Sequence, residues 1–267
     1  MVVGENIINR GFPFMETKFY DESSMMRVFN WHWYKDQMTG WSTRSYQLLL
    51  IGIVSQLLIG FWNGITPLGV TSTIAGIIGF TCTISITNGK PINGVLGIIS
   101  AIMLIYVASV TGNYSDIIMQ GFYIVFLDVP ILKNWAVKKV EPRKLNVKYS
   151  IQTALTFVGF LIVTYSLDIS PWLNSPRPFI DALSATIGLT GAVLTVRRFR
   201  ASYYFWTLQG VASIVLWIST ALAGHAVWVL MFTYCLYLGN DILSFCDKDI
   251  AWFHHKKDDE NPNEISK

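Results

Sequence analysis

From residue 46 onward, apolar residues fill most of the chain in runs long enough to cross a membrane. A helix needs about 20 residues to span about 30 Å of hydrocarbon. Eight runs have this length: 46–62, 68–87, 93–111, 116–135, 149–168, 178–196, 202–222 and 226–246. Inside the uncharged stretch from residue 201 to 240, Ala223, Gly224 and His225 predict a turn. The pattern therefore predicts an all-α membrane protein with eight transmembrane helices.

The segment Gly112–Trp135 recurs weakly 111 positions later as Ala223–Cys246. This offset aligns Tyr123 with Tyr234, and it pairs the second to fourth predicted helices with the sixth to eighth. We therefore predict two three-helix repeats, with the first helix as an extra and the fifth as a linker, in the order 1+3+1+3. Because one helix separates the two triplets, they enter the membrane in the same direction and form parallel repeats.

This plan predicts six regions along the chain. They are a cytoplasmic tail with an interfacial amphipathic helix (1–45), the extra helix (46–62), the first repeat (63–136), a basic loop with the linker helix (137–170), the second repeat (171–246) and a polar cytoplasmic tail (247–267). In the first region Met26, Phe29 and Trp33 recur at helical spacing. That spacing fits a helix at the headgroup level or one docked on the bundle.

The composition agrees with a chain that lies mostly in lipid, since 52% of its residues are hydrophobic and 14% are charged. Soluble domains carry roughly a quarter charged residues. Lys and Arg gather in alternate loops, above all in 133–148. Because basic residues in short loops stay in the cytoplasm, both termini are expected there. The three cysteines lie in or at the ends of apolar runs and are interpreted as packing residues: Cys82, Cys235 and Cys246.

The chain lacks the motifs of ATP-driven proteins and of common enzymes. It contains no glycine-rich phosphate loop, no HExxH zinc motif and no ordered Ser/His/Asp set. We therefore expect no enzymatic activity, no cofactor, no metal ion and no nucleic-acid partner.

Polar side chains lie within the predicted helix 116–135, where a lipid-facing helix would carry none. One face of this helix holds Asp116, Gln120, Tyr123 and Leu127, with Asp128 at its edge. Asp116 is expected to help begin the helix. Asp128 is the only acid predicted deep within a helix, where an unpaired charge costs about 2.5–3.5 kcal/mol. It is interpreted either as a substrate-binding group or as an ion-pair partner of Lys133.

A second polar stripe lies on the helix 202–222, where Trp206, Gln209, Ser213 and Trp217 share one face. An aromatic stripe is more often core than binding site, but the amide and the hydroxyl interrupt it and favour a cavity lining. The last helix adds Tyr234, and Asn240 and Asp241 follow near its end; on the third helix Asn93, Gly97 and Ser100 share a face. Aromatic faces with a few amides suit a flat, polyhydroxylated, cationic small molecule.

These residues and their spacing resemble the Pnu vitamin transporters, most closely their nicotinamide riboside branch. The marks are FNW at 29–31, GW at 40–41, NGKPINGVLG at 88–97, GNYSDIIMQ at 112–120, and the basic loop leading to Tyr204 and Trp206. The resemblance implies a SWEET-like fold, a homotrimer of independently working protomers and a bacterial cytoplasmic membrane. It also implies facilitated diffusion of nicotinamide riboside with trapping by a cytosolic kinase, and it places Asn93, Gln120, Tyr123 and Trp206 at or near the substrate.

The chain departs from this pattern at Leu127, Asp128 and Pro130, and again at Asn240 and Asp241. The substrate therefore stays open, with thiamine, riboflavin or a deoxyribonucleoside as alternatives. A non-transporting scaffold and an intramembrane enzyme are alternatives of other classes; the lack of a nucleophile–base pair disfavours the enzyme. Because Asp128 is the only deep acid, we expect uptake to need no ion gradient. The predicted substrate-binding residues are Asn93, Gln120, Tyr123, Asp128, Trp206, Gln209, Tyr234 and Asn240.

Overall fold

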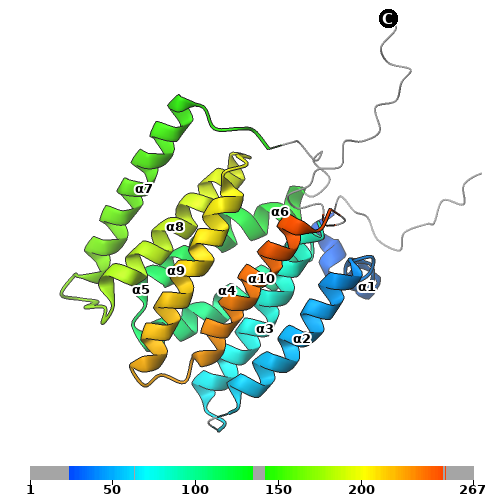
Figure 1. The fold of residues 1–267 in the computed structure, drawn as a ribbon, viewed down its shortest axis with the longest axis horizontal. Coiled ribbons are helices and arrows are strands. Elements are labelled where there is room, and N and C mark those ends of the chain that lie inside the picture. Colours follow the sequence, from blue (N-terminus) through cyan, green and yellow to red (C-terminus); the bar gives the residue numbers. More distant parts are fainter. Residues whose placement is uncertain (1–23, 63, 135–141, 249, 251–267) are drawn as a thin grey trace, which may run out of the picture.

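The computed structural model describes residues 24–62, 64–134, 142–248 and 250, and these form helices packed side by side (Figure 1). The first elements are the short 3-10 helix η1 (Met25–Phe29) and α1 (Trp31–Gln37). The elements that follow are α2 (Thr43–Gly60), α3 (Pro67–Thr87), α4 (Asn93–Thr111), α5 (Tyr114–Tyr123), η2 (Ile124–Asp128), α6 (Val129–Asn134), α7 (Val147–Asp168), α8 (Pro178–Val196), α9 (Ser202–Leu222) and α10 (Trp228–Cys246). The predicted polar tails lie mostly outside the described residues.

Seven helical segments within the described ranges are long and apolar enough to cross a membrane. They are α3, α4, the continuous segment from α5 to α6, α7, α8, α9 and α10. α2 has 18 residues, but it begins with the polar run Thr43–Ser45 and is not among the seven. The prediction of an all-α, multi-pass membrane protein is confirmed, whereas the eighth span stays a prediction.

Six helices form a closed ring, in which each packs on the next in the order α3, α4, α5, α8, α9, α10 and back to α3. The third helix of each predicted repeat thus packs on the first helix of the other, α5 on α8 and α10 on α3. Outside the ring, α2 packs on α3 and α10, while α7 packs on α8 and α5. α2 and α7 therefore occupy equivalent places at opposite edges of the bundle (Figure 1).

The helix boundaries follow the predicted offset of 111 positions. Pro67 begins α3, and Pro178 begins α8; proline is well suited to the first turn, where its missing N–H has no partner to lose. α4 ends at Thr111 and α9 ends at Leu222. The predicted turn after α9 is present, with Gly224 in the left-handed region at φ 95°. We call the end of the bundle where α2 begins and α10 ends the basic end.

The predicted helix 116–135 is not one regular helix. It begins at Tyr114 as α5, widens into the π-helix η2, and continues as α6. A π-helical turn holds more residues than an α-helical turn, so the side chains after it are rotated away from the predicted stripe. Asp128 is therefore buried, with 9% exposure, whereas Leu127 is only half-buried. The π-helical turn thus makes Asp128, predicted at the edge of the inward face, more buried than Leu127.

The segment before α2 is not one amphipathic helix either. Asn30 ends η1 and caps α1, since its side chain accepts a hydrogen bond from a backbone N–H of the first turn. Trp33 is buried against the start of α4 and against α6. Phe29, predicted on the same stripe, is 81% exposed. The cap thus splits the stripe, and Trp33 docks on the bundle while Phe29 points outward.

Candidate functional site: a central aromatic and amide cluster

Four of the eight predicted residues meet in the middle of the ring. Tyr123 of α5 and Trp206 of α9 make an edge-to-face contact with ring centroids 5.4 Å apart. Gln209 is buried, and its Nε2 donates a hydrogen bond of 2.8 Å to Ser213 Oγ. Tyr234 of α10 is buried with its hydroxyl in hydrogen-bonding reach of both Gln209 and Ser213. Side chains from α5, α9 and α10 thus form one aromatic and amide cluster.

Gly188 of α8 makes this packing possible. A Cβ atom at this position would clash with Tyr123 Oη and Met119 Sδ. Tyr123 Oη is itself buried without a hydrogen-bond partner. An unpartnered buried hydroxyl costs about 1–3 kcal/mol, so a ligand that hydrogen-bonds to Tyr123 would remove this cost. The cluster therefore has an unused polar atom at its centre.

The indole of Trp206 is held by its own contacts. Its Nε1 donates a hydrogen bond of 3.0 Å to Thr195 Oγ1 of α8. The ring lies over Gly191, where an added Cβ would meet its carbon atoms at 3.7 Å. Because one edge of the indole is bonded and the ring is backed by α8, its orientation is fixed before any ligand arrives.

Asp128 faces α4 and not the end of its own helix. Its carboxyl group lies against Gly97, where an added Cβ would clash with it. Among the described residues Asp128 has no hydrogen-bond or ion-pair partner, and Lys133, the predicted partner, is exposed. The predicted ion pair with Lys133 is therefore not formed. Gly97, which was predicted to share a face of α4 with Asn93 and Ser100, provides the surface on which the Asp128 carboxyl group lies.

The remaining three predicted residues take part in other contacts. Asn93 Nδ2 donates to Lys90 O at 2.8 Å, and Asn240 Oδ1 accepts from Thr87 Oγ1 at 3.3 Å, both near the basic end. Asn240 Nδ2 is buried without a partner. Gln120 Nε2 donates to Asp116 Oδ1 at 3.5 Å. These contacts do not involve the Tyr123–Trp206 pair.

Three carboxyl groups that the sequence did not bring together meet at the opposite end of the bundle. Ser115 Oγ donates to Asp168 Oδ2 at 2.7 Å, and Ser115 N donates to Asp181 Oδ2 at 3.0 Å. Asp116 N donates to Asp181 Oδ1 at 3.1 Å, so Asp181 of α8 caps the N-terminus of α5. Asp128 is therefore not the only buried acid, although these three lie at helix ends and not deep within a helix. The sequence feature that could have indicated this cluster is an acidic residue in the first turn of an apolar helix, as at Asp181.

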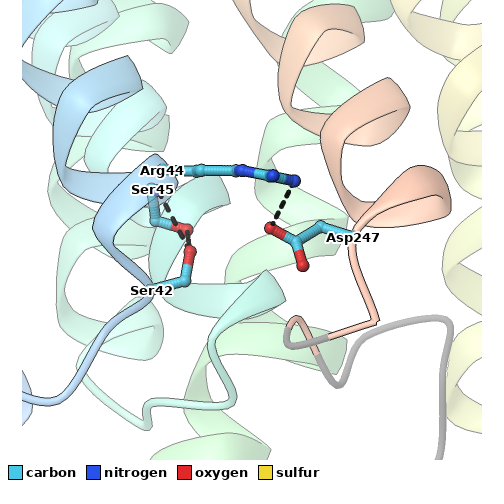
Figure 2. Close-up of polar contacts among 4 residues, drawn as sticks. All are labelled: Ser42, Arg44, Ser45 and Asp247. Atoms are coloured by element: carbon cyan, nitrogen blue, oxygen red, sulfur yellow. Dashed lines mark hydrogen bonds and ion pairs between the residues drawn. The ribbon is translucent and has the colours of Figure 1, made fainter.

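The basic end holds an open cavity of about 470 Å³. Figure 2 shows Arg44 reaching across it to Asp247, with N and O atoms 3.2 Å apart, beside the bonded pair Ser42 and Ser45. Asn88 Nδ2 donates to Ser45 Oγ, which joins the end of α3 to the start of α2. The Arg44 side chain is 66% exposed, and exposed ion pairs contribute about 0–1 kcal/mol. These contacts connect the start of α2 with the ends of α3 and α10.

A closed ring of membrane-length helices, with an aromatic and polar cluster between two similar halves, is the architecture of a membrane transporter. Residues 69–252 match the family model described as nicotinamide mononucleotide transporter, and the chain belongs to this family. The resemblance to the Pnu transporters is thus confirmed. The family is one of transporters, so the expectation that the chain is not an enzyme is supported, and the scaffold alternative is set aside.

Individual relatives agree with the family. The chain is 22% identical over 225 residues to the nicotinamide riboside transporter PnuC of Neisseria mucosa, which covers 80% of this chain and 83% of that relative. It is 24% identical over 220 residues to the nicotinamide riboside transporter PnuC of Haemophilus influenzae, covering 78% and 90%. The crystal structure of the vitamin B3 transporter PnuC superposes with a TM-score of 0.65 at 21% identity, covering 85% of this chain and 99% of that chain. This structural likeness shows the fold.

Proposed function

We propose that the chain is a uniporter that carries nicotinamide riboside across the membrane by facilitated diffusion, with trapping by phosphorylation in the cytosol. The observation that carries this proposal is the Tyr123–Trp206 pair, with Gln209 beside it and Tyr123 Oη unpartnered. The cluster lies where the two halves meet, since α5 packs on α8. The relatives' names supply the substrate.

The chemistry of nicotinamide riboside fits this cluster. The pyridinium ring is a fixed cation, and an aromatic face attracts such a cation by roughly 0.5–2 kcal/mol. Amide and phenol groups pair with the ribose hydroxyls, which gives Gln209 and Tyr123 a role in binding. Asp128 is buried without a hydrogen-bond or ion-pair partner, so its carboxyl group favours the ionised form only when the cationic substrate lies near it. Phosphorylation adds negative charge to the product, so the same carboxylate opposes its return.

The first test is counterflow of radiolabelled nicotinamide riboside in proteoliposomes. Counterflow should appear in sealed vesicles with proton and sodium gradients clamped to zero, and thiamine, riboflavin or deoxyribonucleosides should compete weakly. Collapse of counterflow under the clamp would refute the uniport mechanism. Stronger competition by one of the other vitamins would reassign the substrate.

We further propose that α2 is the eighth span, completing the 1+3+1+3 arrangement and its six regions. Its outward face is apolar, with Leu50, Ile51 and Leu58 each at least 60% exposed, and α2 occupies the place equivalent to α7. Basic loops at one end of the bundle favour a cytoplasmic location for that end and for both termini. The working assembly is proposed as a homotrimer.

Cysteine labelling tests the orientation. Ser115 is fully buried and unsuitable for labelling, whereas Trp172, in the turn after α7, is 94% exposed, and Arg198, at the basic end, is exposed too. In a background without native cysteines, Trp172→Cys should react with an impermeant thiol reagent added outside, and Arg198→Cys should not. The reverse labelling would invert the topology.

A further inference from the structure

Three carboxyl groups take no part in the proposed transport site, although they are among the most deeply buried polar groups of the bundle. Asp116, Asp168 and Asp181 come from α5, α7 and α8, and none is more than 1% exposed. Asp168 and Asp181 flank the same Ser115, and Asp181 interacts electrostatically with both other acids. We call these three residues the acidic joint.

The hydrogen bonds of the acidic joint are unequally distributed. Asp181 accepts two backbone N–H groups, one on each oxygen, at the positive N-terminal end of α5. Asp116 Oδ2 and Asp168 Oδ1, in contrast, are buried without a hydrogen-bond partner. An ionised carboxylate needs donors on both oxygens when it is removed from water. The surroundings therefore suit one charged group, Asp181, and two uncharged ones.

The groups around the acidic joint do not neutralise three negative charges. Arg177, before α8, is the neighbouring cation, but its guanidinium donates to Thr111 O and Asn113 Oδ1. Burial, and then Arg177, lower the pKa of His225, so this side chain is neutral at pH 7. The other titratable side chains of the packed helices at this end are phenols: Tyr106, Tyr114 and Tyr165.

We propose that the acidic joint is a proton-binding site, with protons on Asp116 and Asp168 and the negative charge on Asp181. Neighbouring buried carboxyl groups cannot all ionise, and their protons titrate as a property of the set. A metal ion does not fit, since no three His, Cys, Asp or Glu side chains of the described residues are arranged to hold one. The bound protons hold α5 against α7 and α8, and α5 carries Tyr123 of the transport site.

Infrared spectroscopy tests the proposal directly, because a protonated carboxyl group has a C=O stretch separate from the carboxylate bands. The purified wild-type protein should show this band at pH 7 and lose it at alkaline pH. Asp116→Asn and Asp168→Asn should each reduce it, whereas Asp36→Asn, at an exposed position of α1, should leave it unchanged. Absence of the band from the wild type at pH 7, or equal bands in all four proteins, would overturn the proposal.

Thermal melting in detergent provides a second readout that does not depend on transport, so it separates this proposal from the proposed function. The native protein would hold protons that an unfolded chain, with Asp pKa near 3.9, has released. Stability should therefore fall as the pH rises above about 4, by about tenfold in the folding equilibrium per proton and pH unit. Asp116→Asn and Asp168→Asn should each flatten this slope.

His225 cannot produce this slope, because a lowered histidine pKa removes stability as the pH falls. Melting temperatures that rise with sodium chloride but not with choline chloride, and do so only in the wild type, would assign the joint to a sodium ion and overturn the proton. An equal pH dependence of the melting temperature in the wild type and both variants would also overturn the proton-binding proposal.

Discussion

The two halves of the ring have the same backbone plan but unequal chemistry. α3, α4 and the segment from α5 to α6 begin and end close to 111 positions before α8, α9 and α10, and each third helix packs on the other half's first helix. The polar groups of the central cluster nevertheless come mainly from α5 and α9. Tyr123 and Tyr234 are counterparts and both belong to the cluster, but Trp206 and Gln209 have the apolar counterparts Val95 and Ile98. Outside the cluster, the counterpart of Gln120 is Met231 and that of Asp128 is Gly239.

The contacts by which the outer helices α2 and α7 pack on the ring also differ in chemistry. α2 is joined to α10 by Gln56, which is fully buried and accepts 2.8 Å from Thr233 Oγ1. α7 is joined to α5 and α8 by the acidic joint. In parallel-repeat transporters the halves move about a fixed site. The shared backbone suits that motion, and the unequal side chains would allow the proposed substrate only one orientation between the halves.

The largest effect is expected when Gly188 is replaced by the residue that stands at the equivalent position of the first half. Its counterpart is Ile77, and Gly188→Ile would force a side chain into the space of Tyr123 Oη. We expect nicotinamide riboside counterflow to fall to background, with Gly188→Ala in between. Ile77→Val is the matched control in the other half and should retain counterflow. Normal counterflow in a folded Gly188→Ile protein would remove Tyr123 from the site.

Replacing the aromatic face comes next in size. Trp206→Ala removes the cation–π contribution and buried area, and should weaken nicotinamide riboside binding at least about tenfold. Trp206→Phe should lose less because a ring is kept. Val95→Ala, at the counterpart position, should bind like the wild type in isothermal titration calorimetry. Equal affinities in all four proteins would place Trp206 in the core.

The effect of Asp128→Asn on binding is expected to depend on the charge of the substrate. A carboxylate in a medium of reduced dielectric favours a cation, so the nearly isosteric amide should weaken nicotinamide riboside binding by about 1.4 kcal/mol, a factor of ten. Binding of a neutral nucleoside should change much less. Asp241→Asn is the control, since Asp241 already accepts from Thr207 Oγ1. Unchanged affinity with a lowered melting temperature would make Asp128 a structural residue.

The smallest effect is expected where α2 meets α10. Gln56→Leu keeps the volume and removes the bond to Thr233, whose hydroxyl still donates to Val229 O. The free energy of unfolding should fall by about 1 kcal/mol. Gln47→Leu, the same change at an exposed position of α2, should leave the melting temperature unchanged. A loss of about 3 kcal/mol or more would mean that this neutral contact is as important as the acidic joint.

Hydropathy alone predicted most of the fold, because lipid demands helices with apolar surfaces of fixed length. It also placed Tyr123, Trp206, Gln209 and Tyr234 on inward faces, and these four do meet. It did not anticipate that Asp128 would be more buried than Leu127, because one π-helical turn changes which side chain points inward and a regular helical period contains no such turn.

The acidic joint was missed for a different reason. Asp116, Asp168 and Asp181 lie at helix ends, where sequence reading expects solvated caps, and only the packing of three separate helices buries them together. For Asn93 and Asn240, the sequence could not show that their side chains already bond to a backbone carbonyl and to a hydroxyl group.

The equivalent placement of α2 and α7 bears on how such a chain arises. A duplicated unit with an odd number of spans reverses direction in the membrane unless another helix is inserted between the copies. With α2 as the proposed eighth span, a unit of four spans, α2 to α6 followed by α7 to α10, would keep its direction through a simple tandem duplication. On this basis α7 is the first helix of the second copy, inherited with it, and no separate origin for a linker is needed.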